Sequence, residues 1–250
     1  MTQHIFDHQQ HPRIAIMKTN CRTWLSGLAA VTALITVGSP SEAERAERAE
    51  RNEKSLSASQ SPNSAAPAAA VLGAGADLTQ QDTEVLQITT DLGREIAQVM
   101  EQWLASGAIT EDRLFSRLYY PIADTDPVKY NTDYDTLADR DFPNVQEKYL
   151  SKSSTFMFAI ASDINGYVPT HNKQFSQPLS GNRALDFVSN RSKRFFGDTV
   201  GMNGARSTAP RLRQTYQRDT GELAENMSVP ITIRGKHWGC VRIGYRRVDK

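Results

Sequence analysis

Arginine, histidine and aromatic residues recur in the second half of the chain, in a pattern that suits the binding of a small solute. Ligand sites combine apolar and aromatic walls with a few polar groups that fix the orientation of the ligand. The candidate ligand contacts selected on this basis are Tyr167, His171, Asn172, Arg191, Arg194, Asp198, Gln214, Tyr216, Arg218, His237 and Trp238. They are spread over several elements, so they form a site only if those elements pack together.

Three arginines give this set its chemistry. The guanidinium groups of Arg191, Arg194 and Arg218 present paired N–H donors that match a carboxylate or a phosphate. Tyr216 and Trp238 would wall such a site, and the two histidines would donate hydrogen bonds. The sequence therefore predicts that a small anionic or polar solute binds between a sheet and residues 183–198.

Several candidates also have a purely structural interpretation, which the sequence leaves open. Trp238 begins an apolar strand and fits a protein core. Arg218 precedes Asp219 at a turn, where the two could form an ion pair. His171 and Asn172 could simply bond neighbouring backbone groups.

The motifs of metal sites and hydrolases are not found in the sequence. His171 and His237 could in principle bind zinc with Asp198 or Asp219, but pairs at His-x-x-x-His or Cys-x-x-Cys spacing are missing. There is no Gly-x-Ser-x-Gly nucleophile elbow. We therefore expect a protein that binds rather than catalyses, without a cofactor.

The first 43 residues are typical of a secretory signal peptide. A basic segment at residues 17–22 precedes an apolar run at residues 25–37, and Ser41 and Ala43 are the small residues expected before a cleavage site. Polar residues 1–16 suggest that translation starts at Met17. The alternative is an uncleaved anchor, but the run is shorter than the roughly 20 residues that span a bilayer. We expect a periplasmic or secreted protein.

Composition then divides the rest of the chain. Residues 44–76 are charged at first and then rich in Ala, Ser and Pro, as in a disordered linker. Residues 77–250 form the expected domain. Five of the 57 charged residues lie in residues 1–43, three basic and two acidic, so the remainder is neutral, which argues against nucleic acid as a partner. The one cysteine beyond the signal, Cys240, lies in an apolar run and suits a core.

The domain begins with a helical pattern. Large apolar residues recur every three or four positions from Val85 to Trp103, which predicts a long amphipathic helix over residues 82–106. Thr110 can cap a second, shorter helix. Residues 121–143 read as an extended loop that leads to a short helix at residues 144–150.

Strand signals dominate from residue 155 onward. An apolar strand at residues 155–161 leads into Asp163-Ile-Asn-Gly166, read as a hairpin turn, with Tyr167 and Val168 as the returning strand. Residues 182–196 read as helical or irregular. Residues 211–218, 227–234 and 237–246 complete an expected five-stranded antiparallel sheet. The long helix packs on it, so the fold class is α+β.

Several separated motifs, in this order, resemble the sensory region of bacterial methyl-accepting chemotaxis receptors, which is similar to PAS and single Cache sensor domains. They are Leu114-Phe-x-x-x-Tyr-x-Pro-Ile122, Thr125-Asp-Pro-x-x-Tyr130, Asp163-x-Asn-Gly-Tyr-Val-Pro-Thr-His-Asn172, Asn190-Arg191 with Lys193-Arg194-x-Phe-x-Asp198, Gln214-Thr-Tyr-x-Arg-Asp219, and Pro230-Ile-x-Ile-x-Gly-Lys-His-Trp-Gly239 with Arg242 and Tyr245. The resemblance covers about residues 86–245. It implies a PAS-like or Cache-like fold and a role in chemotactic signal transduction.

The chain departs from such receptors in ways that bear on function. Their transmembrane helices, linker module and cytoplasmic coiled coil are missing, so a sensor of this kind must pass its signal to a partner such as a membrane receptor or histidine kinase. A Cys-x-x-Cys-His motif is also missing, which excludes covalent haem. Two further hypotheses remain: a protein that dimerises or docks through the helix at residues 82–106, and a metal-dependent or hydrolytic enzyme.

Overall fold

The computed structural model describes residues 77–217 and 223–248. The predicted signal peptide, the predicted linker and Arg218 lie outside these residues. The elements, in chain order, are α2 (Gln80–Ala105), α3 (Glu111–Leu114), β1 (Tyr120–Ile122), β2 (Lys129–Asn131), α4 (Asp135–Leu150), β3 (Phe156–Asp163), β4 (Tyr167–Val168), the 3₁₀ helix η1 (Lys173–Phe175), α5 (Arg183–Ser189), β5 (Arg194–Phe195), α6 (Thr199–Arg206), β6 (Leu212–Gln217), β7 (Leu223–Ile233) and β8 (Lys236–Tyr245).

Helix α2 is anchored at its first turn. The Thr79 hydroxyl accepts a hydrogen bond from the Asp82 amide, and the Asp82 carboxylate in turn accepts from the Thr79 amide, forming a capping box. The same carboxylate also binds the Arg213 guanidinium and the Tyr245 hydroxyl, each at 2.5 Å. The start of α2 is thereby tied to strands β6 and β8.

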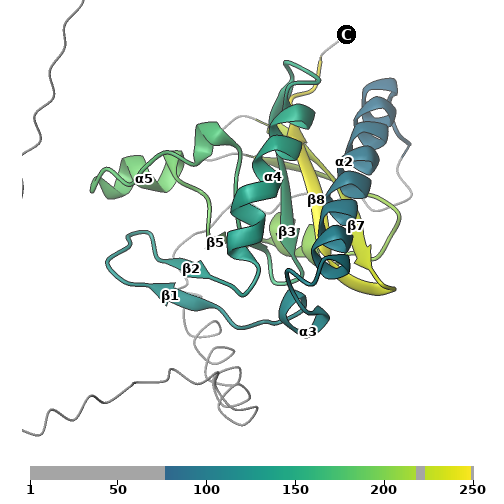
Figure 1. The fold of residues 1–250 in the computed structure, drawn as a ribbon. Coiled ribbons are helices and arrows are strands. Elements are labelled where there is room, and N and C mark those ends of the chain that lie inside the picture. The colour runs from purple at the N-terminus through teal and green to yellow at the C-terminus, as the bar shows by residue number, and fades with distance from the viewer. Residues whose placement is uncertain (1–76, 218–222, 249–250) are drawn as a thin grey trace, which may run out of the picture. The chain divides into compact units, whose positions relative to one another are not determined.

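The main sheet has four antiparallel strands in the order β3-β8-β7-β6 (Figure 1). Strands β7 and β8 form a hairpin whose turn holds Arg234 and Gly235 at φ angles of 49° and 78°. Two short two-stranded sheets, β1-β2 and β4-β5, lie outside it. The predicted α+β class is confirmed, with a mostly antiparallel sheet.

Helices α2 and α4 cover one face of the main sheet, and α6 packs on the other (Figure 1). The core lies on the first face, where Gly93 of α2 approaches Val229 and Val241 closely. On the second face, Gly204 of α6 lies directly above Ser228 and Arg242, where an added Cβ would be 2.8 Å from the Ser228 hydroxyl. The sheet thus has an apolar face and a polar one.

The main sheet has four strands in the described residues, so the predicted five-stranded sheet is not confirmed. The turn at Gly166 forms as expected, with φ at 75° and a 2.9 Å bond from its amide to the Asp163 carbonyl. Beyond this turn, however, Tyr167 and Val168 pair with Phe195 and Arg194 of β5 instead of returning along β3. A turn fixes where the chain reverses, whereas a strand this short is held by the partner it meets later in the chain.

Two further segments differ from the sequence interpretation. Helix α4 begins at Asp135 and continues through Pro143, in place of a loop that ends there. Thr132 positions its start, since its amide and hydroxyl both donate to the Asp135 carboxylate. Residues 120–131, also read as loop, form the β1-β2 hairpin, and α6 was not anticipated at all.

The two ends of the described domain meet at one side chain. Gln81 in the first turn of α2 donates to the Arg246 carbonyl at 2.9 Å and accepts from the Val248 amide at 3.1 Å. The end of β8 is therefore held beside the beginning of α2.

Candidate functional site

Two adjacent rows of residues cross the polar face of the main sheet. Strand register places Ile160, Arg242, Ser228 and Leu212 in one row, and Phe158, Gly244, Asn226 and Gln214 in the next. The Phe158 ring lies directly over Gly244, where any Cβ would be 2.3 Å from the ring. Glycine at this position therefore lets an aromatic ring lie flat across the centre of the face.

Arg242 is the central cation of this face and is only 6% exposed. Its Nε donates to the Asn226 side-chain oxygen at 3.1 Å, and Asn226 in turn donates to the Ser228 hydroxyl at 2.8 Å. The guanidinium carbon is 5.8 Å from the centre of the Phe158 ring. Within the described residues no carboxylate forms an ion pair with Arg242.

His171 is buried at the edge of this face and is electrically neutral. Its Nδ1 accepts a hydrogen bond from the Asn172 amide at 2.8 Å, so the ring proton is assigned to Nε2. Burial, and then the charges of Arg191, Arg242 and Arg194, lower the pKa of His171 well below its usual value. Both observations favour the uncharged ring, with its proton on Nε2 as a hydrogen-bond donor.

Three arginines converge on this histidine through shared phenyl rings. Arg242 lies over Phe158, Arg191 is 5.3 Å from the centre of Phe175, and Arg194 is 5.8 Å from the centre of Phe196. Each of these rings also packs against the His171 imidazole, at centre-to-centre distances of 6.0, 5.0 and 6.3 Å respectively. We call His171, Arg191, Arg194 and Arg242 the arginine cluster.

Arg194 has a second set of contacts that fix its position. Its Nη1 donates to the Phe187 carbonyl at 2.8 Å and the Asn190 carbonyl at 3.2 Å, and its guanidinium lies 4.5 Å from the centre of the Phe187 ring. Burial and then Arg191 lower the pKa of Arg194 to about 10. As with Arg242, no carboxylate in the described part of the chain pairs with it.

Gln214 adds an unsatisfied polar group to the same face. Its side chain is fully buried, and neither its amide nitrogen nor its amide oxygen has a hydrogen-bond partner among the described residues. A buried polar group without a partner costs about 1–3 kcal/mol, so such groups mark places that are completed by water or a ligand.

This arrangement has the groups that bind an anion. Buried cations are usually paired with acids, and two arginines of the cluster have none in the described structure. Their aromatic supports hold the guanidinium planes in fixed orientations, which favours planar, bidentate recognition of carboxylate or phosphate. Neutral His171 contributes a donor without adding a charge.

The sequence predicted His171, Arg191, Arg194 and Gln214 in a site of this kind. The fold places Arg191 and Arg194 close to the His171 ring. Gln214 lies on the polar face of the sheet, in the row next to that of Arg242. Tyr216 is half-buried on the same strand as Gln214. Arg242 and Asn226 were not in the candidate set. The signal that could have found them is strand alternation, since Cys240, Arg242 and Gly244 share one face of β8.

Other candidates have structural roles instead. Tyr167 and Trp238 lie in the apolar core, where Tyr167 donates to the Asp135 carboxylate at 2.8 Å and Trp238 to the Leu114 carbonyl at 3.3 Å. Asn172 joins strand β3 to helix α4, because its side chain accepts from the Ala159 amide and donates to Glu147. Asp198 is exposed and caps α6 through the Gly201 amide at 2.9 Å.

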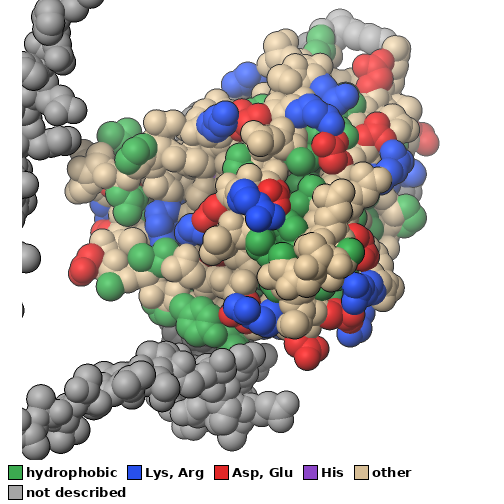
Figure 2. All heavy atoms as spheres, in the orientation of Figure 1, with side chains coloured by type: hydrophobic (Ala, Val, Ile, Leu, Met, Phe, Trp, Pro, Cys, Tyr) green, Lys and Arg blue, Asp and Glu red, His purple; other side chains and the backbone are tan. Residues whose placement is uncertain are grey.

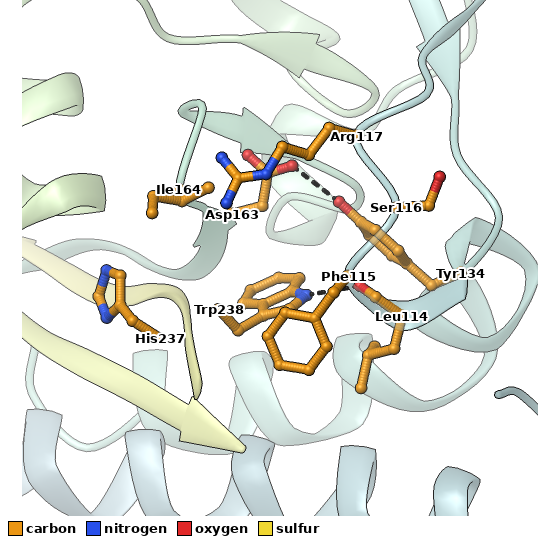
Figure 3. A pocket seen from close by; sticks show the side chains of 9 residues that line it. All are labelled: Leu114, Phe115, Ser116, Arg117, Tyr134, Asp163, Ile164, His237 and Trp238. Carbon is orange, nitrogen blue, oxygen red and sulfur yellow. Dashed lines mark hydrogen bonds between the residues drawn. The ribbon is translucent and has the colours of Figure 1, made fainter. Parts of the chain in front are cut away.

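His237 and Trp238 border a different cavity, at the far end of the sheet (Figure 3). Buried Asp163 lies beside this cavity and accepts from the hydroxyl groups of Tyr119 at 2.5 Å and Tyr134 at 3.0 Å. Burial raises the pKa of Asp163 despite these bonds. The cavity volume is about 10 Å³, which is room for one water molecule and not for a solute.

A larger hollow of about 440 Å³ lies at the surface beside α2 and α4, lined by Val99, Gln102, Trp103, Ser106, Arg140, Asp141 and Asn144. Its two charged groups, Arg140 and Asp141, pair with each other at 2.7 Å. Asp141 also accepts from the Trp103 indole at 2.6 Å. These polar groups already have partners within the protein, so none of them needs a ligand to complete its hydrogen bonds.

The described residues hold no group of three or more histidine, cysteine or acidic side chains placed to bind a metal ion. Over the same residues, no helix is long and apolar enough to cross a membrane.

Comparison with known proteins gives no match, either to protein-family models or to curated proteins.

Proposed function

We propose that this chain is an exported, ligand-binding sensory module whose arginine cluster binds a small solute bearing a carboxylate or phosphate group. The observation that carries the proposal is the pair of buried arginines, Arg194 and Arg242, without acidic partners among the described residues. The sequence resemblance to chemoreceptor sensor domains of the PAS and Cache kind supports the sensory role. The pattern of residues 1–43 supports export.

The site proposed here differs from the sequence prediction in its walls. Phe158, Phe175 and Phe196 take the place of Tyr216 and Trp238 around the ligand, and Arg242 supplies the cation at the centre of the sheet. The ligand still lies between the sheet and residues 183–198. A partner protein, such as a membrane receptor or histidine kinase, would receive the signal.

The alternative, an interaction protein that dimerises through the helix at residues 82–106, receives less support. The apolar residues of that helix, among them Leu92, Ile96 and Met100, are fully buried against the rest of the domain. Its remaining surface is therefore mostly polar, and a dimer would have to use other contacts. For a metal-dependent enzyme, the described residues offer no cluster of three or more metal-binding side chains.

Calorimetric titration of the purified full chain with carboxylates, amino acids, purines and phosphates tests the proposal. We expect one anionic class to bind, and Arg242→Met to weaken that binding at least about 30-fold, because a buried charge-assisted contact is lost. The matched control is Arg94→Met, which removes an arginine that is 61% exposed on α2, far from the arginine cluster in sequence and contacts. Failure of every class to bind, or equal binding by Arg242→Met, would refute the proposal.

A further inference from the structure

Helix α5 carries an unusual exposed apolar surface. Seven large apolar side chains are exposed in the described structure, and five of them belong to one region: Val128 at 55%, Leu179 at 39%, Leu185 at 51%, Phe187 at 48% and Val188 at 42%. We call these five residues the α5 patch. Hydrophobic side chains gather over α5 in the space-filling view (Figure 2). A concentrated apolar surface of this kind marks a site of interaction.

The orientation of α5 is the reverse of an ordinary surface helix. Its acidic residue, Asp186, is turned inward and is 1% exposed, whereas Leu185, Phe187 and Val188 face outward. Asp186 accepts hydrogen bonds from the Ser180 amide and hydroxyl, at 2.8 and 2.7 Å, and from the Gly181 amide at 3.0 Å. The hydrogen bonds of Asp186 therefore fix the orientation of α5, which leaves Leu185, Phe187 and Val188 exposed.

The patch is fixed to the domain by polar contacts on both sides. Arg183 at the start of α5 pairs with Asp126 at 2.9 Å, which brings the β1-β2 turn and Val128 beside the helix. Buried Lys129 donates to the Asn190 side chain and to the Ser192 carbonyl. These contacts therefore hold the segment that carries the patch in a fixed position on the domain.

The charge around the patch is positive. Residues 173–194 contain five Lys or Arg residues and a single acid, Asp186, which is buried. Lys173 and Arg183 are exposed, and Arg191 is partly so. The acids nearby are Asp124, which is exposed, Asp126, which is paired with Arg183, and Asp135 and exposed Asp139, which are both paired with Lys193. Outward apolar side chains within a cationic segment suit a negatively charged lipid surface.

The shape of this region favours the same occupant. Figure 1 shows α5 standing away from α2 and the main sheet, on the side of the β1-β2 hairpin. A projecting helix can enter the headgroup layer of a bilayer, whereas a flat face would suit a second copy of the chain better. We propose that the α5 patch docks this domain on an anionic lipid surface, with Leu185, Phe187 and Val188 at the boundary of the acyl chains.

Vesicle sedimentation of the full chain tests this inference, with phosphatidylcholine vesicles that contain or lack phosphatidylglycerol. We expect sedimentation with the anionic vesicles that falls as salt rises. The double variant Leu185→Ser, Val188→Ser, which leaves the Phe187 ring over Arg194 in place, should bind about tenfold or more weakly, because two apolar side chains no longer enter the lipid. Leu223→Ser is the matched control, since Leu223 is 67% exposed outside the patch, and it should sediment like the wild type.

The apolar run at residues 25–37 is common to all these proteins, so differences between them report on the patch. Circular dichroism of each variant should match the wild type, because the replaced side chains lie outside the buried core. Equal sedimentation of the double variant and the wild type would overturn the inference. So would sedimentation-velocity data showing a wild-type dimer that the double variant abolishes, since a second copy would then be the occupant.

Discussion

Replacement of Gln214 by methionine should stabilise the protein, which is opposite to the usual effect of a core substitution. The Gln214 side chain is fully buried and its two amide atoms have no partner among the described residues. A buried side-chain amide without partners costs about 1–3 kcal/mol as a whole. Methionine has a similar unbranched shape and no strong polar group.

The size of the effect follows from these costs. Relief of the unpaired groups should raise the free energy of unfolding by about 1–3 kcal/mol. For a domain of this size, that corresponds to an increase in melting temperature of about 2–10 °C. Urea titration followed by circular dichroism measures the first quantity, and a thermal scan measures the second.

Gln146 provides a matched control, because it is equally buried but fully paired. Its amide nitrogen donates to the Thr170 carbonyl at 3.2 Å, and its oxygen accepts from the Ala161 amide at 2.9 Å. Gln146→Met leaves both backbone groups unpaired and should destabilise the protein by about 2–4 kcal/mol. If Gln214→Met destabilises to the same extent, Gln214 has a partner in solution, and the reasoning about its unpaired amide is refuted.

Three further outcomes are expected. Asp82→Asn should cost about 3–5 kcal/mol in a urea titration, since it breaks a buried pair with Arg213 and weakens the bond from Tyr245. Burial alone would raise the pKa of Asp82, but the bonds it accepts lower it below 3.8, so its contribution is complete above pH 4 and lost as pH falls further. Burial lowers the pKa of Lys129 from 10.5 to about 8; the unfolding free energy should therefore rise between these pH values, and Lys129→Met should remove that rise. Burial raises the pKa of the Cys240 thiol to about 11, so a thiol reagent should label it only after unfolding; rapid labelling in the native protein of Cys240 itself, identified by peptide mapping apart from Cys21, would contradict this.

Patterns of local origin predicted the fold best. The spacing of Leu92, Ile96 and Met100 describes a buried helical stripe, and the structure buries all three residues. The last three strands were expected within a few residues of β6, β7 and β8, because alternation and turn residues both act over short distances. The reversal at Gly166 was expected for the same reason.

Errors arose where distant partners decide the structure. Tyr167 and Val168 belong with Phe195 and Arg194, a pairing across some 27 positions that no local pattern announces. Pro143 suggested the end of a loop, yet a proline costs a helix one hydrogen bond, and burial of Phe142 and Val145 on either side offsets that cost. Proline does weaken a helix, but Pro143 does not mark the end of a loop, because α4 runs through it.

The candidate site shows the same division. The sequence selected His171, Arg191 and Arg194, which the fold brings close together, because arginine and histidine carry the same chemistry in any fold. It left Trp238 open between a ligand contact and a core residue, and the fold places that side chain in the core, beside Leu114 and Tyr134. It did not select Arg242, because this residue lies in an apolar strand. Its place on the polar face of the sheet becomes clear only from the strand register.

The hydrogen bonds of Gln81 to Arg246 and Val248 hold the two ends of the described domain beside each other. Since the start of α2 and the end of β8 already touch, a short linker could join them, and new ends could be opened at the exposed turn between β7 and β8. Such a circular permutant would place β8 first in the sequence while keeping the strand order β3-β8-β7-β6. For the same reason the domain can be inserted as a unit into a loop of another protein, because both of its ends leave from one place.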